Sequence, residues 1–231
     1  MVYFLVVMST KVLVAAGLLA AGVYALLWLA VATDWRWLDV ADSWVLRQFH
    51  DGSAHHPGWI GFWRAVSDVL SPTVLRIVAV VAVIAAVVRG KTRAAVFLVL
   101  TLGAMGLVTV TAKALADRPR PDTALALETS TAFPSGHALG MTVGALAFIT
   151  VLWPHLSASM RRHAGVVAFT LIVLVGVARV ALNVHHPSDV LAGWVLGFLY
   201  YLMCVAVVWW PVPQASAKVT SQTWSRLTQH R

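Results

Sequence analysis

Three short clusters hold most of the side chains in this sequence that could do chemistry. The first runs Lys113-Ala-Leu-Ala-Asp-Arg-Pro-Arg-Pro121, the second is Pro134-Ser-Gly-His137, and the third extends from Arg179 to Asp189. In the third cluster, His185 and Asp189 are four residues apart around Pro187, which we place in the first turn of a helix. A carboxylate at that spacing can hold the imidazole in one tautomer and stabilise its cation.

Together the clusters supply the groups that phosphoryl transfer requires. Lysine and arginine side chains neutralise the equatorial oxygens of the transferring group, while one histidine attacks and the other protonates the leaving oxygen. Ser135 stands where an apolar helix begins, and a helix start offers unpaired N–H groups to anions. A metal-dependent site would need several oxygen ligands. The acidic residues near the clusters have no familiar metal spacing, so we expect no metal and no cofactor. They are Asp117, Asp122, Glu128 and Asp189.

Each cluster alone also has an ordinary structural explanation. Lys113 and Arg118 could reach lipid headgroups from the end of an apolar helix, and Ser135 could be a helix cap only. Arg179 is harder to explain in this way, because a charge within an otherwise apolar helix is costly and usually functional. The three clusters together therefore favour a catalytic site.

The elements that position these clusters are apolar segments long enough to cross a membrane. Of the 231 residues, 60% are hydrophobic and 11% charged, whereas roughly a quarter are charged in a soluble domain. Because a spanning helix needs about 20 mostly apolar residues, we predict an all-α, polytopic membrane protein, one domain over residues 1–231, with its spans in a single bundle. The six predicted spans are Val12–Ala32, Val74–Val88, Ala94–Leu115, Ala138–Trp153, Ala164–Val184 and Val190–Trp210.

The basic residues predict how the chain is oriented in the membrane. The loops on one side and both tails carry lysine and arginine but no acid, whereas every acidic residue lies in or beside the other three loops. By the positive-inside rule the acid-free side is cytoplasmic. Both termini, including the polar tail at 211–231, are then inside, and the three clusters are at the outer face of the plasma membrane. The residues before Val12 lack a basic start and a cleavage site, so we interpret them as the lead-in to the first span.

The first outer loop, Thr33–Pro72, is rich in tryptophan. Trp35, Trp37 and Leu38 alternate with charged residues, and Trp59 and Trp63 follow farther on. Tryptophan is favoured at the membrane–water boundary. We therefore expect interfacial helices in this loop rather than a simple connector.

The three clusters resemble the pattern of the type 2 phosphatidic acid phosphatase family, which shares its active site with the vanadium haloperoxidases. That pattern is a lysine followed after six residues by Arg-Pro, then Pro-Ser-Gly-His, then Ser-Arg with a histidine and an aspartate at fixed spacing. The one departure is Ala178, where the pattern has serine. That change removes a hydroxyl but no group needed for charge or proton transfer.

The resemblance implies a role for each matched residue. His185 would be the nucleophile that forms a phosphohistidine, Asp189 would orient it, and His137 would be the acid for the leaving group and later the base for water. The phosphate would be held by Lys113, Arg120, Arg179, Ser135 and the Gly136 backbone. Arg118 and His186 match no motif position; Arg118 could contact a lipid headgroup or a second phosphate, and we expect His186 to be a bystander.

The function that we expect is metal-independent hydrolysis of a membrane lipid phosphate, with a polyprenyl diphosphate as the first choice. The small residues near the clusters, such as Gly140, Gly144 and Gly193, could leave a narrow groove for a single isoprenoid chain. The alternative substrates are phosphatidylglycerophosphate and phosphatidate. A haloperoxidase is disfavoured because the family's haloperoxidases are soluble, and a non-enzymatic transporter or scaffold would not need these spacings. The net charge of +8 is scattered, so we expect no nucleic-acid partner.

Overall fold

The structure is a computed structural model that describes residues 10–53 and 56–209, and within these ranges it is a helical bundle without strands. Six segments of the described chain are long and apolar enough to span a membrane, which confirms the predicted fold class. The predictions for residues 1–9 and for the tail at 211–231 lie outside the described residues. The helices are α2 (Thr10–Ala32), α3 (Arg36–Ser53), α4 (Pro57–Val69), α5 (Pro72–Val88), α6 (Thr92–Leu98), α7 (Ala104–Ala116), α8 (Gly136–Leu152), α9 (Ala158–Ala181) and α10 (Pro187–Trp209).

The third span is one helix with an irregular middle. A π-helical stretch, Val99–Gly103, connects α6 to α7, so the span runs continuously from Thr92 to Ala116. Within it, the Thr101 hydroxyl donates to the Phe97 carbonyl at 2.7 Å. That bond satisfies a polar side chain which is fully buried in the bundle core.

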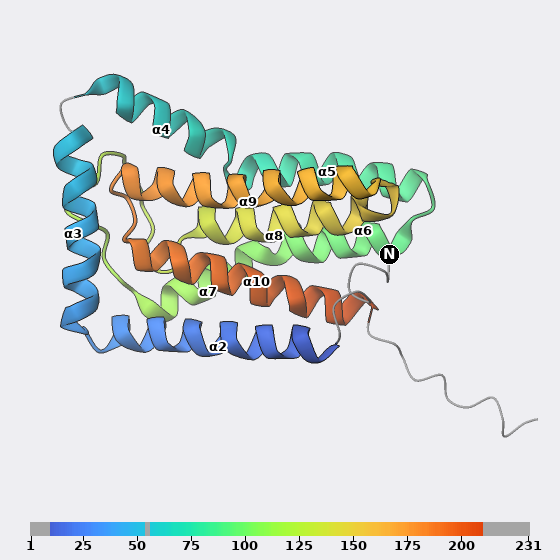
Figure 1. The fold of residues 1–231 in the computed structure, drawn as a ribbon, viewed down its shortest axis with the longest axis horizontal. Helices are drawn as coiled ribbons and strands as arrows, with labels where there is room; N and C mark the ends of the chain where they lie inside the picture. The colour runs from blue at the N-terminus through green and yellow to red at the C-terminus, as the bar shows by residue number, and fades with distance from the viewer. Residues whose placement is uncertain (1–9, 54–55, 210–231) are drawn as a thin grey trace, which may run out of the picture.

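The centre of the bundle is the contact between α8 and α10, which lie side by side in Figure 1. Two glycines of α10 make this approach possible. A Cβ on Gly193 would lie 2.6 Å from the Ser135 carbonyl oxygen, and one on Gly197 would lie 2.8 Å from that of Leu139. Since side chains cannot approach backbone so closely, glycine at these two positions lets the helices meet.

Two glycines of α8, Gly140 and Gly144, are also packed against a neighbouring helix. A Cβ on Gly140 would lie 3.1 Å from Pro72, and one on Gly144 would lie 3.1 Å from Leu75, both of α5. Ala138, Gly140, Gly144 and Gly193 are buried. The expectation that these residues leave a groove is therefore wrong for them, because neighbouring helices fill the space.

Two helices of the first long loop lie at one end of the bundle, which we call the α3 end. Figure 1 shows α3 crossing the ends of the spanning helices, nearly at right angles to them, and α4 leading into α5. Helix α3 turns Leu38, Asp42 and Leu46 inwards, while Trp37 and Trp44 are exposed. Helix α4 packs through Trp63 against α9. Residues Gly58–Val88 together are long and apolar enough to count as one candidate span, and within them the predicted second span corresponds to α5, which begins at Pro72.

Candidate active site

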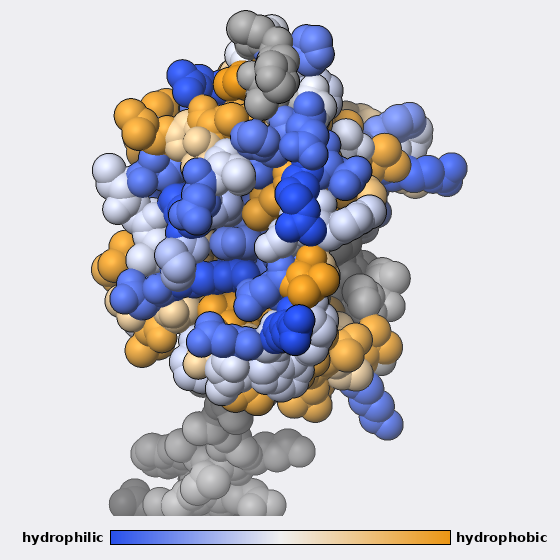
Figure 2. Space-filling view, turned by 90° about the vertical axis from the view of Figure 1, so that its left-hand side faces the viewer, coloured by the Kyte–Doolittle hydropathy of each residue, from blue (hydrophilic) through white to orange (hydrophobic). Residues whose placement is uncertain are grey.

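All three sequence clusters meet at the α3 end of the bundle. Lys113 lies in the last turn of α7 and Arg179 in the last turn of α9. Ser135 is the N-cap residue of α8, and Asp189 lies in the first turn of α10, which begins at Pro187 as the sequence predicts. His185 lies in the short connection between α9 and α10. Viewed onto this end, hydrophilic residues gather across the centre and hydrophobic residues lie mainly towards the edges (Figure 2).

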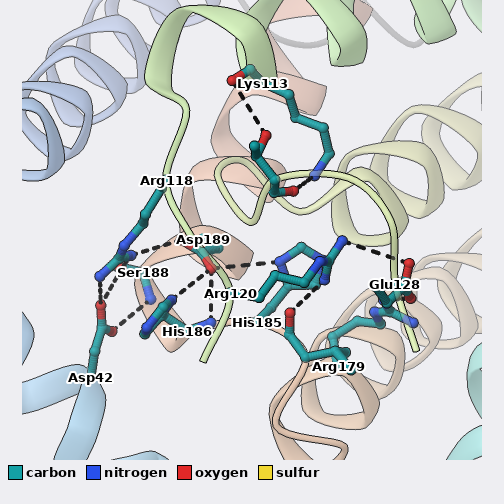
Figure 3. Close-up of polar contacts among 12 residues, drawn as sticks. Asp42, Lys113, Arg118, Arg120, Glu128, Arg179, His185, His186, Ser188 and Asp189 are labelled. Carbon is teal, nitrogen blue, oxygen red and sulfur yellow. Dashed lines mark hydrogen bonds and ion pairs between the residues drawn. The ribbon is translucent and has the colours of Figure 1, made fainter. Parts of the chain in front are cut away.

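The histidine and the aspartate of the third cluster face one another in the interior. His185 is 1% exposed and Asp189 is fully buried, and the His185 Nδ1 lies 3.5 Å from the Asp189 Oδ2. On the other side of the ring, Nε2 is 3.3 Å from the Arg120 Nη1 (Figure 3). Burial, with help from the positive charges of Arg179 and Arg120, lowers the pKa of His185 to about 3. The imidazole is therefore neutral near pH 7, which is the form that can act as a nucleophile.

The Asp189 carboxylate has more partners than the sequence predicts. Its Oδ1 accepts from the Arg118 Nη1 at 2.7 Å. Its Oδ2 accepts from the His186 backbone N–H at 2.8 Å and lies 3.1 Å from the His186 Nδ1. The His186 ring, which we expected to be a bystander, therefore contacts the same oxygen that faces His185.

Three cations of the first and third clusters contact one stretch of loop, Glu128–Thr131: they are Lys113, Arg120 and Arg179. Lys113 donates to the Thr131 carbonyl. Arg120 donates through Nε to the Ser130 carbonyl at 2.6 Å and through Nη1 to the Val184 carbonyl at 2.5 Å. This stretch of loop therefore lies over the cations that are predicted to bind phosphate.

Glu128 is an acidic residue that sequence reasoning did not assign to the site. It forms an ion pair with Arg179 and lies 3.6 Å from the Arg120 Nη2. Burial alone would raise its pKa, but the hydrogen bond and charge of Arg179 and the charge of Arg120 outweigh burial and lower it. Arg179 itself is 3% exposed and also donates to the Ser67 hydroxyl of α4 at 2.8 Å. The Glu128 carboxylate thus occupies a position suited to an anion.

Ser135 begins α8 without acting as a side-chain cap. Its backbone N–H donates to the Asp189 carbonyl at 2.9 Å, which ties the start of α8 to the start of α10. Its hydroxyl is buried and, like the Arg179 Nε, has no hydrogen-bond partner among the residues that the structure describes. Both groups can therefore donate to a bound anion. Gly136 and His137 follow in the first turn, where His137 interacts electrostatically with Arg179 and His185.

Arg118 is not available to a second phosphate, which corrects the expectation from sequence. It is 8% exposed, and its Nη2 is 2.9 Å from the Asp42 Oδ2 while Nη1 contacts Asp189 and Ser188. Burial alone would lower its pKa, but the Asp189 and Asp42 carboxylates outweigh burial and raise it. Asp42 belongs to α3, far before the motifs. Its signal in the sequence is an acid on the apolar face defined by Leu38 and Leu46, four residues to either side.

The fold and this site define an integral-membrane helical bundle with a buried His-Asp pair and clustered cations at one end. A sequence profile of the PAP2 superfamily matches residues 94–213, just over half of the chain, and the chain therefore belongs to that superfamily. The family predicted from the motifs is confirmed.

The chain is similar to phosphatases of Bacillus subtilis, both in sequence and in structure. It is 34% identical over 116 residues to phosphatidylglycerophosphatase B of strain 168, a match that covers 49% of this chain and 57% of that protein. The matched stretch is thus little more than half of the relative's length. Among solved structures, the crystal structure of a transmembrane PAP2 type phosphatidylglycerolphosphate phosphatase from Bacillus subtilis superposes with a TM-score of 0.74 at 25% identity. That superposition covers 83% of this chain and 94% of the other.

Proposed function

We propose that this protein hydrolyses the phosphate monoester of a membrane glycerolipid, of the phosphatidylglycerophosphate type, without a metal. The observation that carries the proposal is the buried His185–Asp189 pair beside three cations, at one end of a bundle with the apolar length to span a membrane. The cations are Lys113, Arg120 and Arg179. They neutralise the phosphate in place of a metal ion.

His185 is the nucleophile in this proposal. With its proton on Nδ1, towards Asp189, the Nε2 lone pair attacks phosphorus. The N–P bond forms as the P–O bond to the lipid alcohol breaks, and His137 gives a proton to that leaving oxygen. This half-reaction yields the free lipid alcohol and a phosphohistidine at position 185.

Water completes the reaction. His137, now neutral, takes a proton from water as the water oxygen attacks phosphorus and the N–P bond breaks. Inorganic phosphate leaves, His185 is again neutral and His137 again protonated. Throughout, the Asp189 carboxylate stabilises the positive charge that develops on the attacking ring.

Several donors would hold the phosphate during both steps. Besides the three cations, the Ser135 hydroxyl and the Arg179 Nε have no partner elsewhere in the described chain. The unpaired N–H groups at the start of α8 add positive potential. Glu128 would compete with phosphate for Arg179, because its carboxylate already pairs with the Nη2 end of that guanidinium group.

The tail of the substrate would lie against the membrane side of the bundle. An apolar groove of about 530 Å³ between α2, α7 and α10 is lined by side chains that include Tyr24, Trp28 and Ala112. Ala112 precedes Lys113, and the Tyr24 ring lies 6.0 Å from the ring of Phe133, next to Pro134. The groove is therefore lined by the residue before Lys113 and by a ring that contacts Phe133, two positions before Ser135. We assign a lipid chain to it.

The glycerolipid assignment replaces the polyprenyl diphosphate that we first expected. That expectation depended on a spare cation at Arg118 and on a groove among small residues. Arg118 is paired with two carboxylates, and the small residues of α8 and α10 are packed between helices. Both relatives described above are named for phosphatidylglycerophosphate. By the positive-inside rule we place the site at the outer face of the plasma membrane and both termini inside.

A substrate panel tests the assignment. Phosphate release by the purified protein in detergent would be compared for phosphatidylglycerophosphate, phosphatidate and a polyprenyl diphosphate. We expect the highest kcat/KM for phosphatidylglycerophosphate and full activity in a strong chelator. If kcat/KM were about tenfold higher for the polyprenyl diphosphate, a difference of about 1.4 kcal/mol, the isoprenoid lipid would be the better assignment for the substrate. If activity were lost in the chelator and restored by magnesium, the proposed metal-independent mechanism would be wrong.

A further inference from the structure

We propose that Asp42 of helix α3 is a positioning residue for catalysis, which acts on Asp189 through Arg118 and Ser188. The inference depends on the proposed function, in which Asp189 supports the nucleophile His185. It adds to the active site a residue from the first long loop, far from the sequence clusters and before the region that matches the superfamily.

Asp42 is buried, and both oxygens of its carboxylate accept hydrogen bonds. It is 3% exposed, although α3 crosses the end of the bundle and most of its other polar residues are exposed. Its Oδ1 accepts from the Ser188 backbone N–H at 3.0 Å, and its Oδ2 accepts from the Ser188 hydroxyl at 2.5 Å and from the Arg118 Nη2 at 2.9 Å. Such a side chain cannot contact a lipid phosphate. It can act only through the groups that it binds.

Those two groups lead directly to Asp189 (Figure 3). Arg118 donates from Nη1 to the Asp189 Oδ1 at 2.7 Å and to the Ser188 hydroxyl at 2.7 Å. Ser188 precedes Asp189 in the chain, so fixing both its N–H and its hydroxyl fixes the first turn of α10. Asp42 therefore holds the Asp189 backbone through Ser188 and its carboxylate through Arg118.

The charges explain why a carboxylate at position 42 matters. Arg118 can form a two-pronged pair with a single carboxylate, and such a pair with Asp189 would draw negative charge away from His185. Asp42 prevents this pairing because it binds the Nη2 end of the guanidinium. Two buried carboxylates then share one guanidinium. The remaining negative charge favours the positive charge that develops on His185 during phosphoryl transfer.

Asp39 provides a matched control on the same helix. It is also an acid near Arg118, with Oδ1 at 3.5 Å from Nη2, but its side chain is 58% exposed. Solvent screens a pair of this kind, so it contributes little. Asp39→Asn removes the same charge from the same helix while leaving the buried network intact.

The test compares Asp42→Asn, Asp42→Glu and Asp39→Asn in the full chain. Initial rates would be measured on phosphatidylglycerophosphate and on a soluble aryl phosphate, with the thermal midpoint and elution volume as checks of folding. For Asp42→Asn we expect kcat to fall about tenfold or more on both substrates, as for loss of a charged hydrogen bond, with KM nearly unchanged. Formation of the phosphohistidine should slow equally. Asp42→Glu should recover part of kcat, and Asp39→Asn should match the wild type.

A double-mutant cycle of Asp42→Asn and Ser188→Ala tests whether the effect of Asp42 on kcat passes through Ser188. If Asp42 acts through Ser188, the double variant should lose less than the product of the two single losses. A folded Asp42→Asn protein with wild-type kcat, or one that loses only KM for the lipid, would overturn the positioning role. If Asp42→Asn does not fold, Ser188→Ala alone must lower kcat on both substrates for the proposal to stand. A wild-type protein that releases no phosphate from any substrate would instead contradict the proposed function.

Discussion

His185 and His186 face the same oxygen of Asp189: the Nδ1 atoms of the two rings lie 3.5 and 3.1 Å from Oδ2. Consecutive residues thus share one carboxylate. The farther ring is buried and beside Arg120, whereas the nearer ring is partly exposed. Burial and the contact with Arg120, rather than distance to the carboxylate, therefore distinguish His185, the proposed nucleophile, from His186.

The two histidines should therefore differ sharply on substitution. We expect His185→Ala to abolish turnover and any acid-labile phosphoenzyme. We expect His186→Ala to change kcat no more than about threefold, below 1 kcal/mol, because the His186 backbone N–H still holds the Asp189 Oδ2 at 2.8 Å. Trapping of labelled phosphoenzyme measures both. Equal losses would mean that the roles of the two rings are misassigned.

His137 should matter in proportion to the basicity of the leaving group. A lipid alcohol needs a proton as it departs, while an aryl oxygen needs little. His137→Ala should therefore slow cleavage of the lipid phosphate much more than cleavage of an aryl phosphate. Steady-state rates on both substrates provide the comparison, and parallel losses would contradict the acid role.

Removing the Glu128 charge should strengthen anion binding. Glu128 pairs with Arg179 and lies near Arg120, so it competes with phosphate for both guanidinium groups. We expect Glu128→Gln to lower the inhibition constant of orthovanadate severalfold, since vanadate can adopt the trigonal bipyramidal shape of the transferring group. Weaker inhibition in the variant would mean that Glu128 organises the arginines for phosphate instead.

The buried His185 should make stability depend on pH in a defined direction. Its pKa is about 3 in the folded protein, against about 6.5 in an unfolded chain. Between these values the unfolded state binds more protons, so stability rises with pH across that window. It should fall progressively as the pH drops below about 6.5. Thermal midpoints in detergent between pH 4 and pH 8, for the wild type and His185→Gln, test this. A variant with an unchanged pH slope would contradict the assignment.

Labelling of single cysteines tests the orientation. Gly52 and Ser159 are exposed, near the α3 end and the opposite end of the bundle, and Cys204 is buried. In intact cells, an impermeant thiol reagent should label Gly52→Cys and spare Ser159→Cys. The reverse pattern would place the active site inside the cell.

The sequence predicted the parts of this protein that depend on composition and local spacing. Span length and apolarity identified the membrane helices, and Pro187 correctly marked the start of α10. His185 and Asp189 could be paired because they are only four positions apart. Ser135 could also be placed at the start of α8, because the apolar segment that forms the helix follows it directly.

The features that the sequence did not predict depend on distant contacts. Arg118 resembled a free surface cation because its partner Asp42 is 76 residues away. Glu128 lies in an irregular loop without periodicity, so nothing local places it beside Arg179. The glycines of α8 and α10 suggested open space until the helices that fill it were located.

The contact between Asp42 and Ser188 also constrains how the protein is made. The two residues are 146 positions apart, so α3 is synthesised and delivered to the membrane surface long before α10. Until the sixth span inserts, Asp42 on the inward face of α3 lacks its partner Ser188. Catalytic competence is then acquired only at the end of biogenesis, and a chain stalled after its fifth span would be an integral membrane protein without a working active site.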